Sequence, residues 1–164
     1  MSQAPPEPGD VIRHWYLWHD QASQGAEEGV KSRPCLVVRT DLNEHDETKV
    51  YVAPITTQPP QRTNPNAHAI PAATQQRLKL ADRPSWVITN ELNSFTWIGP
   101  DVDRTASGEY IYGALPAGLV RKAQQSIMET ARSRQLKLTP RDDQALIERI
   151  RRLKTPNYDD DRER

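Results

Sequence analysis

The sequence predicts an α+β domain in which short antiparallel strands come first and helices follow. β-branched and aromatic residues gather in short runs between residues 11 and 97, which is typical of strands. Apolar residues recur at helical spacing from residue 119 onward, which predicts helices at the end of the chain. The 14 prolines among 164 residues indicate short elements joined by many turns. A sheet of roughly five or six short strands leaves its edges exposed unless it curls, so we expect a small antiparallel barrel.

Dense apolar runs predict the first three strands, over residues 11–18, 34–40 and 49–55. The polar segment 19–32 between the first two runs spans about 14 residues. This is longer than a usual connection, so the segment is either a functional or a disordered loop. The acidic segment 41–48 is short, and we therefore expect the second and third strands to pair as an antiparallel hairpin.

The middle of the chain predicts shorter elements. We expect an edge strand at 68–71, because proline tolerates sheet edges, and one or two helical turns over 73–80. Further strands are expected at 85–89 and 93–97, and residues 101–112 are expected to form a polar loop.

The last third of the chain predicts two helices. The second has Thr139 as a good N-cap, Pro140 at the first helical position, and Asp142 and Asp143 in the first turn, and it ends at Pro156. The first helix is indicated by apolar residues spaced for one helical face, namely Leu119, Val120, Ala123, Ile127, Met128 and Ala131.

These elements predict one domain with additions at both ends. We expect an unstructured leader at 1–8 and a barrel with its first C-terminal helix at 9–135. An appended basic helix at 136–155 and a solvated acidic tail at 156–164 follow.

The composition bounds the compartment of the protein. Its one cysteine, Cys35, excludes an internal disulfide, and it lies in an apolar run that indicates a buried hydrophobe. No apolar run approaches the ~18–20 residues of a membrane span. The first residues lack the basic and apolar regions of a secretory signal. We therefore expect a cytoplasmic protein without membrane contact.

The formal net charge is zero, but the charge is unevenly distributed. Residues 116–157 hold 10 Lys and Arg against 4 Asp and Glu. Such a segment attracts phosphates or forms a solvated helix surface, and charge alone favours the second interpretation.

Several familiar sites are missing from the sequence. It holds no glycine-rich phosphate loop, no Cys/His cluster with metal-ligand spacing and no nucleophile elbow, so we expect neither a metal nor a cofactor. Its four histidines are scattered. His14 and His19 are possible general bases, but ordinary polar roles are the more common interpretation.

The candidate site comes from strand order. Arg33 precedes the second predicted strand, and Thr56 follows the third. If these strands pair antiparallel, the two side chains converge at one end of the sheet. A guanidinium beside a hydroxyl suits phosphate binding. The alternative is a salt bridge from Arg33 to Glu27 or Glu28 with Thr56 closing a turn, and composition alone favours that alternative.

Four motifs in order resemble the PemK/MazF family of toxins. They are Gly9-Asp10-Val11-Ile12, Ser32-Arg33-Pro34 with the strand after it, Pro54-Ile55-Thr56-Thr57, and the segment from Asn90 to Trp97. The resemblance covers roughly residues 9–130. It implies an SH3-like antiparallel barrel with C-terminal helices, a homodimer, and the toxin of a type II toxin–antitoxin pair.

The resemblance also implies an activity, a metal-independent endoribonuclease that cuts single-stranded RNA at specific sequences. It assigns Arg33 and Thr56 as the catalytic pair and Glu28, or Glu27 if the loop is shifted, as the nearby acid. We further expect RNA contacts from five residues, namely Thr57, Gln58, His14, Trp18 and Asn93. The expected partners are mRNA and a cognate antitoxin.

Two other functions fit the same resemblance. One is a non-catalytic barrel that binds nucleic acid or a protein partner, and the other is a protein binder of the gyrase-poison type. Fold alone does not separate them, because one fold supports many functions.

Overall fold

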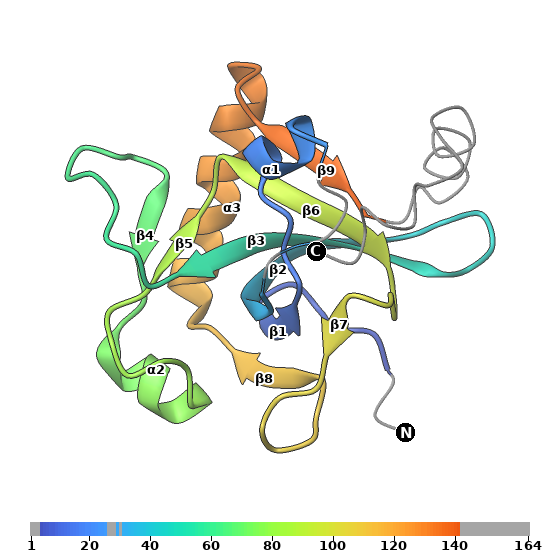
Figure 1. The fold of residues 1–164 in the computed structure, drawn as a ribbon, viewed down its shortest axis with the longest axis horizontal. Helices are drawn as coiled ribbons and strands as arrows, with labels where there is room; N and C mark the ends of the chain where they lie inside the picture. The colour runs from blue at the N-terminus through green and yellow to red at the C-terminus, as the bar shows by residue number, and fades with distance from the viewer. Residues whose placement is uncertain (1–3, 26–28, 30, 142–164) are drawn as a thin grey trace.

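The computed structural model describes residues 4–25, 29 and 31–141. These residues form a nine-stranded, mostly antiparallel sheet with three helices (Figure 1). In chain order the elements are β1 (Asp10–His14), α1 (His19–Ser23), β2 (Arg33–Leu42), β3 (Thr48–Thr56), β4 (Ala67–Ala69), α2 (Ala72–Leu78), β5 (Trp86–Ile88), β6 (Glu91–Thr96), β7 (Val102–Asp103), β8 (Ile111–Ala114), α3 (Ala117–Arg132) and β9 (Lys137–Pro140).

The long β2–β3 hairpin is the centre of the sheet. Strand order along the main path is β4-β5-β3-β2-β1-β7, and β8 pairs with β1. β3 has two partners on its other edge, because β6 pairs with its first part and β5 with its end. The α+β class and the antiparallel sheet are confirmed. Among the described strands, the pairing does not close on itself, so this sheet is open and the expected barrel is only loosely matched.

Both faces of the hairpin are buried, which explains its nearly continuous apolar runs. On one face Leu36 and Ala53 join a cluster with Val120 and Ala123 of α3, which passes behind β3 and β5 in Figure 1. On the other face Val37 joins a second cluster, which includes Tyr16 and Phe95. The candidate site lies at the rim of this second face.

The regular patterns predicted their elements well. Helix α3 follows Pro116 and covers the residues whose spacing predicts it. The helical turns expected at 73–80 are α2, and the expected edge strand at 68–71 is β4. The first strand ends at His14 rather than at residue 18, because the chain then leaves the sheet and the Leu17 N–H donates to Asn93 Oδ1 at 2.9 Å.

The polar segment 101–112 is not a simple loop. It contains the two-residue strand β7 and the start of β8, both of which pair with β1. Among the described residues, no helix is long and apolar enough to cross a membrane.

The helix expected over 136–155 begins differently from the prediction. Lys137–Pro140 form β9, which runs parallel to β6, so Thr139 and Pro140 belong to a strand and do not begin a helix. The backbone N–H and carbonyl groups of this segment find partners on β6, which outweighs the local capping signal. Residues 142–155 and the expected tail at 156–164 lie outside the described residues, as do residues 1–3 of the expected leader.

Candidate functional site

The β2–β3 register brings Arg33 and Thr56 to the same end of the sheet. Cys35 is the partner of Pro54 across the antiparallel pair, so Arg33 and Thr56, two residues further along each strand, lie opposite one another. Arg33 Nη1 lies 3.5 Å from the carbonyl oxygen of Ile55, the residue before Thr56. The convergence expected from strand order is therefore present.

Arg33 is half-buried over an aromatic ring. Its guanidinium carbon lies 5.2 Å from the centre of the Trp18 ring, within the range of a cation–π contact. Its Nε is buried and has no hydrogen-bond partner within the described part of the chain. Burial lowers the pKa of Arg33 from its ordinary value, which reflects the cost of holding this charge away from water. An anion at this position would offset that cost.

Thr56 is the last residue of β3, and its hydroxyl is already oriented. The backbone N–H of Gln58 donates to Thr56 Oγ1 at 3.1 Å, so the hydroxyl keeps its own hydrogen for another acceptor. Thr57 is half-buried and Gln58 is exposed, both directly beyond the strand. Arg33, Trp18, Thr56, Thr57 and Gln58 thus share one end of the sheet.

Sequence reasoning gave Trp86 no role, but the sheet places it in this neighbourhood. Trp86 is the cross-strand partner of Thr56 on one side and of Ala69 on the other. Cross-strand partners share a face, so the half-buried Trp86 ring lies on the same face as Thr56. Only the non-local pairing of β3 with β5 reveals this, and no local motif marks it.

Glu91 is a carboxylate that is linked to Trp18, at this end of the sheet, through the ring of Tyr16. The Tyr16 hydroxyl donates to Glu91 Oε1 at 3.0 Å, and the His19 backbone N–H donates to the same oxygen at 2.9 Å. The Tyr16 ring meets the Trp18 ring edge-on at 5.2 Å. Burial raises the pKa of both Tyr16 and Glu91 above their ordinary values.

Glu28, the acid that the resemblance assigns to the site, lies outside the described residues, as does Glu27. The neighbouring Gly29 is described, and it is buried against the backbone of Tyr16. A Cβ at Gly29 would collide with the Tyr16 carbonyl oxygen, so the end of the 19–32 segment depends on glycine there.

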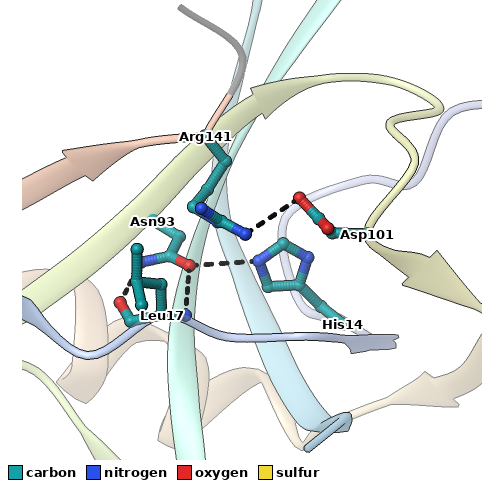
Figure 2. A network of polar contacts seen from close by, with 5 residues as sticks. All are labelled: His14, Leu17, Asn93, Asp101 and Arg141. Atoms are coloured by element: carbon teal, nitrogen blue, oxygen red, sulfur yellow. Dashed lines mark hydrogen bonds and ion pairs between the residues drawn. The ribbon is translucent and has the colours of Figure 1, made fainter. Parts of the chain in front are cut away.

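His14 and Asn93 occupy the interior instead of the surface (Figure 2). Both are 0% exposed, and His14 Nε2 lies 3.1 Å from Asn93 Oδ1. The His14 ring stacks on Phe95 at 4.8 Å, and Asn93 also bonds both backbone groups of Leu17. This corrects the expectation that the two residues contact RNA. They hold the chain that leads into Trp18.

Arg141 covers this network from the end of β9 (Figure 2). Its Nη2 pairs with Asp101 Oδ2 at 3.1 Å, and its backbone N–H donates to the Ser94 carbonyl at 2.7 Å. Burial, together with the positive charge of Arg141, lowers the pKa of His14 to about 4. His14 is therefore neutral at physiological pH.

The other tryptophans differ in exposure. Trp15 is 36% exposed and its Nε1 donates to Asp103, whereas Trp97 packs between Phe95 and Tyr110 in the second apolar cluster. Cys35 is buried, and burial raises the pKa of its thiol. Across residues 4–25, 29 and 31–141, no three His, Cys, Asp or Glu side chains are grouped as metal ligands.

The sequence matches the model of a known protein family. Residues 8–98, more than half of the chain, match the model of the family described as PemK-like, MazF-like toxin of type II toxin–antitoxin system. The matched segment runs from the turn before β1 to the end of β6 and contains Arg33, Thr56 and Trp86. A comparison with curated proteins found no match.

Proposed function

The chain belongs to the PemK-like, MazF-like toxin family of type II toxin–antitoxin systems, and we propose that it is an endoribonuclease. Its proposed catalytic site, formed by Arg33 and Thr56, cuts single-stranded RNA. The strongest support is the position of the half-buried Arg33 beside Thr56. The Arg33 Nε is buried, and no described residue accepts a hydrogen bond from it. A cation held in this way is preorganised for a phosphate.

The reaction uses the RNA itself as nucleophile. The 2′-oxygen attacks the adjacent phosphorus, and the bond from phosphorus to the 5′-oxygen breaks, which leaves a 2′,3′-cyclic phosphate. A base takes the proton of the 2′-OH, and the leaving 5′-oxygen takes a proton from water. No metal is needed for these steps. Because the 2′-OH is the nucleophile, DNA of the same sequence is not cut.

Each residue has a role suited to its chemistry. Arg33 binds the phosphate and stabilises the negative charge that grows on it; its pKa is too high for it to serve as the proton donor. Thr56 donates its hydroxyl hydrogen to the same phosphate. Glu28 accepts the proton of the 2′-OH. Trp18, Thr57 and Gln58 contact the nucleotides on either side.

The partners follow from the family and the site. A type II toxin has a cognate antitoxin, and we propose that it covers the Arg33–Thr56 end and excludes RNA. We also propose that the protein acts in the cytoplasm as a homodimer.

The test is cleavage of a mixed single-stranded RNA pool by purified protein in EDTA. We expect Arg33→Ala to lower kcat by about 100-fold or more, because a preorganised donor to a growing charge is removed. The matched control is Arg39→Ala, an exposed arginine on the same strand whose Nε bonds Asp41. Glu28→Gln, compared with Glu27→Gln in the same assay, tests the assigned base.

The opposite results are equally clear. If wild-type protein cuts no RNA, the ribonuclease proposal fails. If it binds RNA with an affinity that Arg33→Ala and Thr56→Ala leave unchanged, the non-catalytic binding barrel replaces it. Trapped DNA breaks in cells with intact RNA would indicate a gyrase poison.

A further inference from the structure

A cavity of about 610 Å³ lies beside the proposed cleavage site. Its volume falls within the range of sites that hold small organic ligands, and one nucleotide is a ligand of that size. The cavity is formed by α2, the strands β4 and β5, and the loop that joins α2 to β5. Its lining includes Ile70, Ala72, Lys79, Leu80, Arg83 and Trp86.

Trp86 connects this cavity to the proposed catalytic pair. It lines the cavity, and it is also the cross-strand partner of Thr56. Cross-strand partners lie about 4.5–5.5 Å apart. A nucleotide seated against Trp86 is therefore the immediate neighbour of a phosphate held by Thr56 and Arg33.

The cavity is built into the fold without a ligand. The buried Gln75 of α2 donates from Nε2 to the carbonyl oxygens of Ala81 and Arg83, at 3.0 and 2.6 Å. These two bonds fix the loop after α2 against the helix, and the Ile70 backbone N–H donates to the Ser85 carbonyl at 2.9 Å, so the cavity wall is held from both sides. Ile70 is 5% exposed and gives this space an apolar floor.

The lining suits an unpaired RNA base and its phosphate. Trp86 offers an aromatic face, on which any base stacks. Lys79 and Arg83 are exposed at the cavity, against one acidic residue, Asp82. Lys79 ends α2 in the left-handed conformation, with φ of 60°, a conformation that glycine usually supplies at helix ends. A cation is thus placed at the cavity at some conformational cost.

From these observations we infer that the cavity between α2 and β4–β5 binds one unpaired nucleotide next to the bond that is cut, and so contributes to sequence preference. The inference rests on the proposed ribonuclease activity. The apolar floor, the aromatic wall and the excess of positive charge favour RNA over an acidic peptide, whose binding would gain little from a stacking surface.

Two tryptophan substitutions on α2 test the inference. Ala72 and Ala73 are both exposed and adjacent in the first turn of α2, but only Ala72 lines the cavity. Ala72→Trp fills the cavity with bulk. We expect it to raise KM for RNA about tenfold and to weaken the base preference at one position beside the cut, read by sequencing the ends of a cleaved random RNA pool. Ala73→Trp keeps the wild-type KM and preference.

A loss-of-contact variant complements them. Trp86→Leu removes the stacking surface and keeps an apolar side chain; we expect a similar rise in KM and the same altered position. Circular dichroism of each variant verifies the fold. If Trp86→Leu does not fold, Ala72→Trp, a substitution at an exposed site, still tests the inference.

The outcomes separate the two proposals. If wild-type protein cuts RNA and Ala72→Trp cuts it with the same KM and preference, the inference is overturned and the ribonuclease activity stands. If Ala72→Trp weakens only the binding of an antitoxin chain, the cavity belongs to a protein partner and the inference is also overturned. If wild-type protein cuts no RNA, the proposed activity and this inference fail together.

Discussion

His14 and Arg33 are cross-strand partners, yet they meet opposite environments. His14 is enclosed by Asn93, Phe95 and the end of β9, so it is neutral and structural. Arg33 lies at the start of β2, half-buried over the Trp18 ring, with a buried Nε that has no hydrogen-bond partner among the described residues. The same pair of strands thus holds one buried, neutral ring and one half-buried cation.

The buried His14 predicts a pH-dependent stability. Its pKa is about 4 in the folded chain and about 6.5 in the unfolded chain, so the unfolded state binds more protons between these values. Stability is therefore complete above pH 6.5 and is lost as the pH falls through 4. We expect a loss of about 3 kcal/mol between pH 7 and pH 4. Urea unfolding of wild type and His14→Gln across this range measures it.

Comparison of the two proteins isolates the histidine. The raised pKa of Glu91 acts in the opposite direction as the pH falls, but it is common to both proteins and cancels. Equal pH profiles for wild type and His14→Gln would show that His14 does not titrate as its burial requires.

Single residues also show what the sequence can tell of the site. Arg33 and Thr56 follow from strand order alone, because adjacent antiparallel strands bring start and end together. The wrong expectation for His14 arose because its cover, Asn93, is 79 positions away in the chain and leaves no local mark. The position of Trp86 beside Thr56 could not be predicted for the same reason, because the strands that hold these two residues are not consecutive in the sequence.

At the scale of elements, strand β8 supports the cavity wall through Gly113. This glycine has a φ of +139°, and a Cβ there would overlap the Leu78 side chain at the end of α2. Arg77 of the same helix donates to the Ala114 carbonyl at 2.9 Å. The position of α2, and so of the cavity, depends on a close approach to β8.

Gly113→Ala tests this dependence against a matched glycine. Gly108 also has a positive φ, of +89°, but nothing lies within 4 Å of the Cβ it would carry. Both substitutions carry backbone strain, and only Gly113→Ala adds a collision, which costs about 1–3 kcal/mol more. Urea unfolding measures the difference. Equal losses in the two variants would mean that α2 moves aside without cost.

Elements with strong periodicity were predictable, and short paired strands were not. Apolar spacing predicts α3 because one face must meet the sheet over four turns. β7 and β9 are two and four residues long, too short for an apolar repeat to mark them, and their backbone pairing with β1 and β6 defines them. Thr139 and Pro140 carry a genuine helix-start signal that a pairing with β6 overrides.

For the whole molecule, we expect a homodimer. The exposed apolar side chains of the described surface include Leu42, Met128 and Leu138. Sedimentation equilibrium at the concentrations that cut RNA measures the mass, which we expect to be twice that of one chain. A single-chain mass throughout a concentration series would contradict this prediction and would require one chain to bind and cut RNA alone.

The general architecture was predictable at this scale, but sheet closure was not. The order of strands and helices predicts the α+β class from composition and spacing. Whether the sheet closes depends on which edges find partners, and β3 shares one edge between β5 and β6, an arrangement that no local pattern predicts.

The parallel pairing of β9 with β6 has a consequence for synthesis of the chain. Asn93 and Thr139 are partners separated by about 45 residues, so this contact forms late and over a long stretch of chain. While the ribosome makes the helix between them, one edge of β6 stays open, and an open strand edge pairs readily with other chains. The nascent protein reaches its protected form only when Lys137–Pro140 have left the exit tunnel. The interval before that point is when a chaperone or a second nascent copy has access to β6.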